Sequence, residues 1–222
     1  KTIDPNLRLE WLIDEGARVK AGTTILTCSG NARSILTAER TALNLLQTLS
    51  ATATATRALV DTITHTKAQL LDTRKTLPGL RLAQKYAVLQ GGGLNHRIGL
   101  YDAFLIKENH ILAAGGIGAA ITRARKLAPA TRLEIEVESL AELKVAIVGE
   151  PDWIMLDNFP LEELIRAVKL TPDTIKLEAS GGIETPEDLI RIAETGVNYI
   201  SVGALTKHCR AVDLSLRLEA ED

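Results

Sequence analysis

The chain has 222 residues, which is enough for one large domain or for a large domain with a small one. Its apolar and charged fractions are those of an ordinary globular protein, and its net charge of -2 excludes a generally basic, nucleic-acid-binding surface. No apolar run is as long as a membrane span, and no signal peptide is visible. Cys28 and Cys209 lack metal or redox spacing, so we expect a cytoplasmic protein.

The first 36 residues or so are rich in turn residues. Asp14-Glu15-Gly16 and Ala21-Gly22 separate short apolar runs such as Thr24-Ile25-Leu26, which predicts a small β-rich region. The chain begins with Lys1, and its only methionine is Met155. We therefore expect the domain at this end to be incomplete.

A helical pattern follows from Thr37 to about Lys67. Leucines and other apolar residues recur at helical spacing and predict one or two helices. The stretch 51–56 alternates Ala and Thr without Gly, Pro or a charge run. Small residues in such a stretch favour close helix packing over a linker.

From Gln69 onward, short apolar strands alternate with amphipathic helices. The predicted strands are 69–73, 103–106, 132–138, 153–156, 174–179 and 198–202. The predicted helices are 80–90, 117–127, 139–148, 160–169 and 185–194. This alternation predicts parallel strands joined by right-handed crossovers. The regular repeat favours an α/β barrel over an open doubly wound sheet, and about six strands rather than eight predict a partly open barrel.

Nearly every predicted strand ends in polar residues or glycines. These ends are Asp72-Thr73-Arg74-Lys75, Lys107, Glu136-Val137-Glu138, Leu156-Asp157-Asn158, Ala179-Ser180-Gly181-Gly182 and Ser201-Val202-Gly203. The carboxyl ends of the strands form one face of an α/β barrel, and catalysis takes place there. The sequence therefore predicts one site for a small ligand with several negative charges.

Glycines follow the last two strands, at Ser180-Gly181-Gly182-Ile183 and Gly203-Ala204-Leu205. They let the backbone approach a phosphate, which α/β barrels often bind at this position. A tight turn alone would explain either group of glycines taken by itself. Because glycines follow both of the last two strands, phosphate binding is favoured.

Acidic residues alternate with apolar ones at Glu134, Glu136 and Glu138, so the three carboxylates share one strand face. One interpretation is an edge strand with a solvated face. The other is a carboxylate pair with Asp157 that stabilises a cationic sugar centre or holds Mg²⁺ carried by a phosphate substrate.

The basic residues also have two interpretations. Arg74 and Arg97 are either structural partners of Asp72 and Asp102 or ligands for an anion. Lys107 follows an apolar run that indicates a buried strand end. Taken alone, His96 is best explained as a hydrogen-bonding residue of its turn, and Arg40 as a surface ion-pairing residue.

Taken together, these segments resemble the quinolinate phosphoribosyltransferases, also called nicotinate-nucleotide pyrophosphorylases (carboxylating). The resemblance covers essentially the whole chain. It rests on eight segments in order: Ala38–Asn44, Asp72–Thr76, Gly91–Arg97, Leu105–His110, Glu136–Glu138, Leu156–Asn158, Ser180–Gly182 and Ser201–Thr206.

The resemblance implies an open, seven-stranded α/β barrel of the TIM type joined to an N-terminal α/β sandwich. On this basis we expect a partial sandwich domain with connecting helices over residues 1–67, the catalytic barrel over 68–205, and a segment 206–222 that returns toward the N-terminal domain. It also implies a homodimer in which Arg40 reaches the active site of the neighbouring subunit.

The implied activity is phosphoribosyl transfer from phosphoribosyl pyrophosphate to quinolinate with decarboxylation, a step of NAD biosynthesis that uses Mg²⁺. The implied quinolinate ligands are Arg74, His96, Arg97 and Lys107. Lys75 would approach the pyrophosphate, and Glu136 and Asp157 would approach the ribose and Mg²⁺. These three are therefore the expected catalytic residues.

The implied 5′-phosphate ligands are Ser180, Gly181, Gly182, Gly203 and one residue of the pair Lys207 and His208. Many members have Thr-His-Ser where this chain has Thr206-Lys207-His208, so either side chain of that pair is a candidate.

Three rival interpretations stay open at this point. The first is a relative of the molybdenum-locus type that binds another anion. The second is a Schiff-base lyase that uses Lys107 as its nucleophile. The third is a non-catalytic structural subunit.

Overall fold

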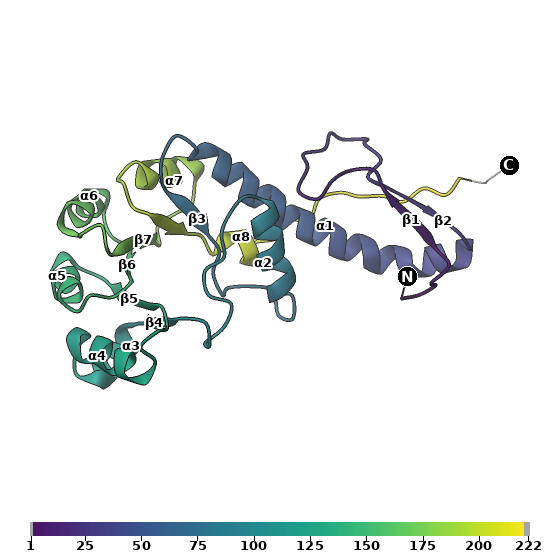
Figure 1. Ribbon diagram of the computed structural model, residues 1–222. Helices are drawn as coiled ribbons and strands as arrows, with labels where there is room; N and C mark the ends of the chain where they lie inside the picture. The colour runs from purple at the N-terminus through teal and green to yellow at the C-terminus, as the bar shows by residue number, and fades with distance from the viewer. Residues whose placement is uncertain (1, 220–222) are drawn as a thin grey trace.

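The structure is a computed structural model that describes residues 2–219. The molecule is elongated, with an α/β barrel at one end, a small antiparallel sheet at the other, and a long helix between them (Figure 1). Lys1 and residues 220–222 belong to the first and last predicted segments and lie outside the described residues.

The N-terminal part contains β1 (Arg8–Trp11) and β2 (Leu26–Ser29). They pair antiparallel, with Arg8 opposite Ser29 and Trp11 opposite Leu26. Gly16 and Gly22 lie in the connection between them with φ values of 75° and 79°, a conformation that favours glycine. The predicted β-rich character of this region is confirmed.

Helix α1 (Ala32–Thr62) begins at the cap residue Asn31, whose side chain accepts hydrogen bonds from the backbone of Arg33 and Ser34. The Ala/Thr stretch lies inside this single helix. Thr52 and Thr56 are buried, and a Cβ at Gly91 would lie 2.5 Å from the Cβ of Thr56. The small residues therefore allow close packing, as the sequence predicts.

Six parallel strands form the barrel sheet among the described residues, in the order β3-β8-β7-β6-β5-β4. They are β3 (Gln69–Leu71), β4 (Phe104–Ile106), β5 (Leu133–Val137), β6 (Trp153–Asp157), β7 (Lys176–Ser180) and β8 (Tyr199–Ser201). The helices are α2 (Arg81–Gln90), α3 (Glu108–Ala114), α4 (Ile117–Leu127), α5 (Leu140–Val148), α6 (Leu161–Leu170), α7 (Pro186–Ala193) and α8 (Ala204–Lys207). All six predicted strands and five predicted helices are present. The short helices α3 and α8 were not predicted.

A seventh sheet position is marked by a single parallel bridge between Leu71 and Leu94. The backbone N–H of Leu94 donates to Leu70, and its carbonyl accepts from Asp72. This segment extends the sheet beyond β3. Among the described residues it does not pair with β4, so the barrel is open on that side.

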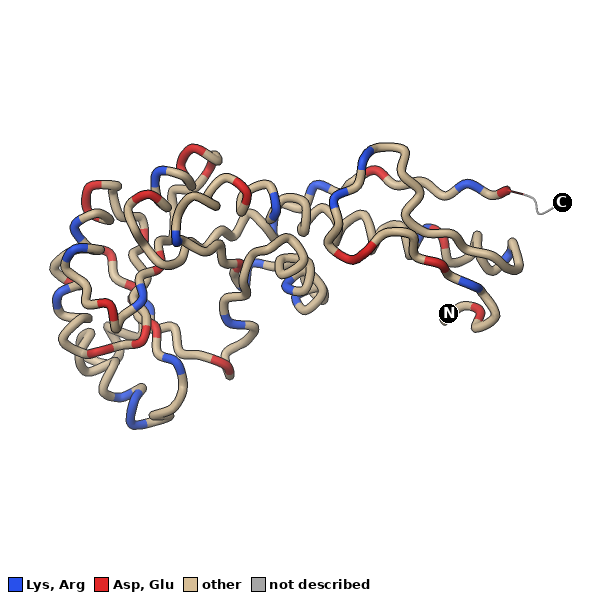
Figure 2. The backbone as a smooth tube through the Cα atoms, turned by 45° about the horizontal axis from the view of Figure 1, so that its top comes forward, with Lys and Arg blue, Asp and Glu red and all other residues tan. Residues whose placement is uncertain are grey.

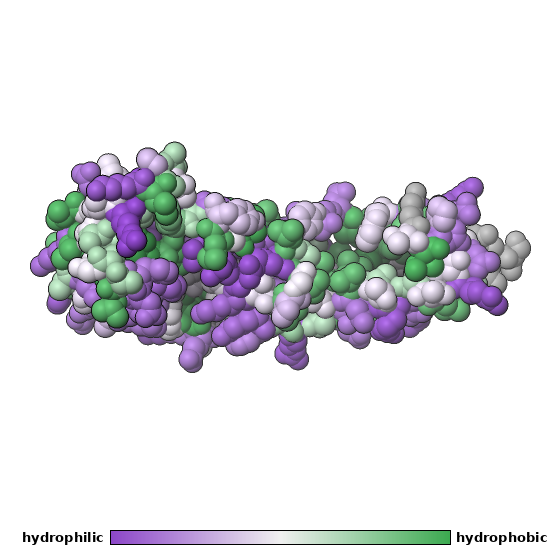
Figure 3. Space-filling view, turned by 90° about the horizontal axis from the view of Figure 1, so that it is seen from below, coloured by the Kyte–Doolittle hydropathy of each residue, from purple (hydrophilic) through white to green (hydrophobic). Residues whose placement is uncertain are grey.

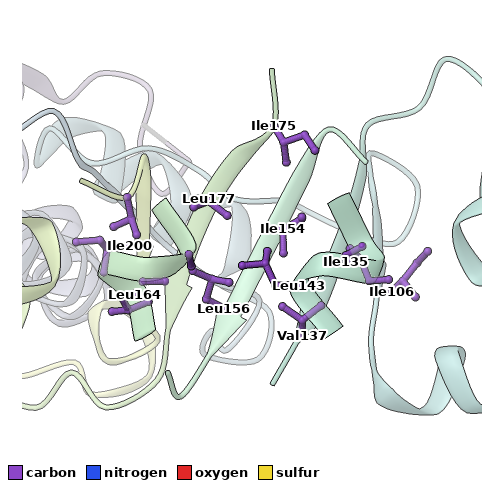
Figure 4. Close-up of a cluster of buried hydrophobic side chains, with 14 of the residues drawn as sticks. Ile106, Ile135, Val137, Leu143, Ile154, Leu156, Leu164, Ile175, Leu177 and Ile200 are labelled. Carbon is purple, nitrogen blue, oxygen red and sulfur yellow. The ribbon is translucent and has the colours of Figure 1, made fainter. Parts of the chain in front are cut away.

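The alternating strand pattern divides the barrel residues into two faces. Ile135, Val137 and Leu156 are fully buried beneath the helices, where they pack with residues such as Leu143 (Figure 4). The residues between them on each strand face the inside of the barrel. The inner face therefore receives the charged residues that the site requires.

The chain beyond α8 runs beside α1 toward the two-stranded sheet (Figure 1). The Val212 backbone N–H donates to the carbonyl of Gln47, and the Cys209 thiol donates to that of Thr48. On the face seen in Figure 3, hydrophilic and hydrophobic residues are interspersed. None of the helices described here is long and apolar enough to cross a membrane.

Candidate active site

A cavity of about 510 Å³ lies at the open side of the barrel. Its lining includes Arg74, Arg97, Lys107 and Arg123, together with His110 and apolar residues of β4 and α4. No carboxylate is among the described lining residues. Figure 2 shows that basic and acidic positions both occur around the barrel. The charged side chains among the described cavity lining are all basic.

The loop after β3 holds Arg74 and Lys75, both exposed. Arg81 of α2 donates to the carbonyl oxygens of Arg74 and Ile98, at 3.1 and 3.3 Å. One guanidinium therefore ties the two cationic loops together. The Thr206 hydroxyl donates to the carbonyl of Lys75 at 2.7 Å, which links this loop to α8.

Arg97 is 8% exposed and lies close enough to Arg74 for the two charges to interact. Burial, and then the charge of Arg74, lowers the pKa of Arg97 from its ordinary value. Among the described residues, neither arginine has a carboxylate within ion-pairing distance. Two such cations favour an anion between them.

The interpretation of these arginines as partners of Asp72 and Asp102 is wrong. Asp102 accepts hydrogen bonds from the backbone N–H groups of Ile98 and Gly99. Asp72 is buried and forms an ion pair with Lys85 of α2 instead.

Sequence reasoning missed Lys85. Its side chain is 2% exposed, and it also donates to the carbonyl of His96, while Asp72 accepts from the His96 backbone N–H at 2.9 Å. Lys85 lies on the buried face of α2 with Val88, three residues later, which is the signal that could have marked it as buried. The pair anchors the turn that carries Arg97.

Lys107 follows β4 and donates a hydrogen bond to Glu136 of β5. Burial raises the pKa of Glu136, and the Lys107 ammonium opposes that shift. Asp157, at the end of β6, is close enough to Glu136 for their charges to repel. The edge-strand interpretation of these glutamates is wrong, because β5 lies between β4 and β6 and Glu136 is only 7% exposed. Glu138, beyond the end of β5, is exposed.

The glycines after β7 permit a close approach of two strand ends. Gly181 has φ 88°, and a Cβ there would lie 2.0 Å from the side-chain oxygen of Asn158. Asn158 itself has φ 54° and donates from its backbone to the Ser180 carbonyl at 2.8 Å. After β8, a Cβ at Gly203 would lie 3.1 Å from the Lys75 side chain. The two glycine turns and Lys75 thus lie at the same strand-end edge.

His96 is 7% exposed and is not among the residues that line the cavity. Its Nε2 lies 2.8 Å from Glu134 and 3.2 Å from Glu178, and its Nδ1 accepts from the Arg97 backbone N–H at 2.7 Å. Burial alone would lower the pKa of His96, but the two glutamates raise it to about 9. Burial and the neighbouring Glu178 raise the pKa of Glu134 to about 7.

Of the predicted site residues, only Arg74, Arg97 and Lys107 are among the residues that line this cavity. Its described lining does not include Lys75, His96, Glu136, Asp157, Ser180, Gly181, Gly182, Gly203, Arg40, Lys207 or His208. Arg40 is exposed near the start of α1, roughly 30 Å of helix before the end that leads to β3. Lys207 ends α8 and His208 follows it, and both are exposed.

The open barrel and its cavity define the class of protein: an α/β-barrel protein with a cavity at its open side that is lined by cationic and apolar residues. Residues 1–50 match the N-terminal domain, and residues 52–217 the C-terminal domain, of the family described as quinolinate phosphoribosyl transferase. The chain belongs to the quinolinate phosphoribosyltransferase family.

Curated relatives agree with this assignment. The nicotinate-nucleotide pyrophosphorylase [carboxylating] of Mycobacterium leprae is 47% identical over 214 residues, which are 95% of this chain and 75% of the relative. The probable enzyme of the same name from Bacillus subtilis is 44% identical over 215 residues, covering 96% of this chain and 74% of the relative.

A solved structure has the same fold. The nicotinate-nucleotide pyrophosphorylase of Francisella tularensis superposes with a TM-score of 0.94 at 53% identity, over 96% of this chain and 76% of that one.

Proposed function

We propose that this chain catalyses phosphoribosyl transfer from phosphoribosyl pyrophosphate to quinolinate, with loss of CO₂, giving nicotinate mononucleotide and pyrophosphate. The observation that carries this assignment is the cavity lined by Arg74, Arg97 and Lys107 without a carboxylate among its described lining residues. Quinolinate is a small dianion, and guanidinium and ammonium groups bind carboxylates through charge-assisted hydrogen bonds. The names of the curated relatives support the same substrate.

Arg74 and Arg97 would bind the two carboxylates of quinolinate, with Lys107 as a third cation. The mutual repulsion of the arginines makes binding of a dianion between them favourable. Lys107 is paired with Glu136. A carboxylate of quinolinate would compete for Lys107 and release Glu136 toward the ribose.

Phosphoribosyl pyrophosphate would lie along the strand ends from β6 to β8. Ser180, Gly181, Gly182 and Gly203 would surround the 5′-phosphate with backbone N–H groups, and Lys207 or His208 would add a charge. Lys75 would neutralise the pyrophosphate as it leaves. Glu136 and Asp157 would stabilise positive charge at C1 of the ribose.

Glu136 and Asp157 fit a magnesium ion, because two neighbouring carboxylates are the hard oxygen ligands that Mg²⁺ prefers. Bound with phosphoribosyl pyrophosphate, Mg²⁺ would supply charge neutralisation on the pyrophosphate. Because Glu136 also accepts a hydrogen bond from Lys107, we expect these two carboxylates to bind Mg²⁺ more weakly than a dedicated metal site would.

The quinolinate nitrogen attacks C1 as pyrophosphate departs, which makes the pyridine ring cationic. When the adjacent carboxylate leaves as CO₂, the electron pair of the broken C–C bond stays on that ring carbon, where the neighbouring cationic nitrogen stabilises it. The carbon then takes up a proton from water, which completes nicotinate mononucleotide. The side chains named above contribute orientation and preorganised charge.

We also propose that the active unit is a homodimer. Arg40 is exposed and distant along α1 from the cavity of its own chain, so it is placed to serve another chain. The resemblance in the segment Ala38–Asn44 supports this role. Sedimentation of the wild-type protein would show whether it is a dimer. An activity assay on a mixture of the Arg40→Ala and Arg97→Ala variants would test the shared site, because a mixed dimer has one site with both arginines and should regain activity.

The rival Schiff-base activity requires a neutral lysine amine. The Lys107 side-chain nitrogen is held in a hydrogen bond to Glu136 instead of being free to attack a carbonyl, which speaks against that activity. Borohydride trapping with a carbonyl substrate should give no covalent adduct.

The direct test is to incubate the protein with quinolinate, phosphoribosyl pyrophosphate and Mg²⁺ and to measure CO₂ and nicotinate mononucleotide. We expect equal amounts of both. Absence of turnover in protein that binds quinolinate would favour a non-catalytic relative. Absence of quinolinate binding by calorimetry would favour a relative that recognises another anion.

A further inference from the structure

Two fully buried carboxylates on the inner face of the barrel have no role in the reaction described above. Glu134 lies on β5, two residues before Glu136, and Glu178 lies on β7. Both are 0% exposed. Their oxygens lie 2.8 and 3.2 Å from the same atom, Nε2 of His96, although neither lies in line with a ring N–H bond. Buried glutamates are rare without a charged or hydrogen-bonding partner, so this contact sets the orientation of the ring.

The other ring nitrogen fixes the position of the proton. The Arg97 backbone N–H points at Nδ1 of His96 at 2.7 Å, so Nδ1 is an acceptor and carries no hydrogen. The ring proton is then on Nε2, which lies within 3.2 Å of an oxygen of each glutamate, although neither oxygen is in line with the N–H bond. The raised pKa of His96 favours a charged ring, but an N–H group at Nδ1 would face the N–H of Arg97 at this distance. The geometry therefore holds the neutral ring.

The same geometry excludes a metal ion. His96, Glu134 and Glu178 offer one donor atom each within 4.8 Å, a spacing that suits a metal. A histidine that binds a metal through one nitrogen donates a hydrogen bond from the other. In this chain the other nitrogen accepts one, so a metal at Nε2 would require the loss of both ring protons.

The contact reaches Arg97 through the backbone. The Arg97 N–H is bound to the ring, and the N–H of His96 is bound to buried Asp72 at 2.9 Å. Two successive peptide groups are thus fixed immediately before the Arg97 side chain, which lines the cavity. The charge of Glu134 also offsets part of the repulsion that Arg74 imposes on Arg97.

We propose that Glu134 and Glu178 are positioning residues for quinolinate. Through Nε2 of His96 they hold the imidazole in the orientation and tautomer that fix the Arg97 backbone, and so aim its guanidinium into the cavity. His96 then supports Arg97 from inside the protein, with Nδ1 bonded to the Arg97 backbone and Nε2 facing the two glutamates. This inference rests on the proposed function in one respect: it takes quinolinate as the anion that Arg97 binds.

The test compares Glu178→Leu and Glu134→Leu with Glu178→Gln and Glu134→Gln. The glutamines keep an acceptor for the Nε2 proton, and the leucines remove it. We expect each leucine variant to weaken quinolinate binding in calorimetry about ten- to a hundredfold, the effect of a misplacement of about 1 Å. The KM for phosphoribosyl pyrophosphate should change less than about twofold, and the glutamine variants should recover most of the loss.

Met155→Leu is the matched control, because Met155 is a buried residue on the inner face of neighbouring β6 and the exchange conserves volume. It should leave both substrates unaffected. If the leucine variants weaken both substrates equally, the glutamates are merely structural and the proposal fails. If a leucine variant does not fold, its glutamine counterpart and the spectroscopic measurement below decide the matter.

The independent readout is the ¹⁵N spectrum of the His96 ring in the wild-type protein at neutral pH. We expect one protonated nitrogen and one unprotonated nitrogen. Two protonated nitrogens would overturn the proposal, as would Mn²⁺ or Zn²⁺ binding that Glu178→Leu abolishes. This spectrum does not depend on turnover. A protein with the expected spectrum and no reaction with quinolinate would contradict the proposed function and leave the His96 arrangement standing.

Discussion

Lys107, which follows the edge strand β4, donates a hydrogen bond to Glu136 on the adjacent strand β5, so a cation expected to bind quinolinate and a carboxylate expected to face the ribose neutralise each other. Removal of Lys107 leaves the buried Glu136 without this contact, and removal of Glu136 leaves the half-buried Lys107 without it. The pair thereby couples the two halves of the proposed site.

Lys107→Ala should lower kcat/KM for quinolinate by about a hundredfold, in line with the cost of removing one partner of a hydrogen-bonded charge pair. Steady-state kinetics with each substrate varied in turn would measure it. Lys107→Arg keeps the charge and should lose less. An unchanged kcat/KM in Lys107→Ala would remove Lys107 from the site.

Lys85→Met should destabilise the fold by about 3–5 kcal/mol, because it leaves the fully buried carboxylate of Asp72 without its ion-pair partner. Unfolding in urea would measure the change. Lys144→Met, on the exposed surface of α5, is the control and should change stability by less than about 0.5 kcal/mol. Equal effects of the two substitutions would show that the buried pair does not anchor the site.

Gly181→Ala and Gly182→Ala separate backbone strain from a steric clash. Both glycines have positive φ, at 88° and 66°, so either alanine should cost about 1 kcal/mol or more of stability. Only Gly181→Ala places a Cβ against Asn158, and it should also raise the KM for phosphoribosyl pyrophosphate. An unchanged KM for phosphoribosyl pyrophosphate in both variants would argue against a phosphate site at this turn.

Asp188→Asn tests the capping box at the start of α7. Hydrogen bonds from Thr185, and then Arg191, lower the pKa of Asp188 to about 2. Because the folded pKa lies below the unfolded one, the stabilisation is present above about pH 4 and is lost as the pH falls toward 2. The wild type should be more stable than the variant at pH 7, and the difference should narrow between pH 4 and pH 2. A difference independent of pH over that window would contradict this assignment.

The sequence predicts the regular elements well because their patterns are local. Helix α4 spans Ile117–Leu127 as expected, since Ile117, Ile121 and Ala124 recur on one buried face. Helix α3 was missed because its seven residues include none that is buried, so no apolar stripe marks it.

The gathering of the predicted strand-end residues at one edge was predictable, because parallel strands bring their carboxyl ends together. The inner glutamates were harder. Alternation places Glu134 and Glu136 on one face, but only closure of the sheet makes that face buried. The partners of Asp72 and His96 could not be predicted, because they depend on contacts between distant segments.

In the proposed function, Arg74, Arg97 and Lys107 recognise two carboxylates at once. Calorimetric titration of the wild-type protein and Arg97→Ala with quinolinate and with nicotinate, which has a single carboxylate, tests it most directly. We predict that the wild type binds quinolinate at least about tenfold more tightly than nicotinate, and that Arg97→Ala removes the preference while its melting temperature stays near that of the wild type. Equal affinity of the wild type for the two ligands, or an unchanged preference in Arg97→Ala, would contradict the account.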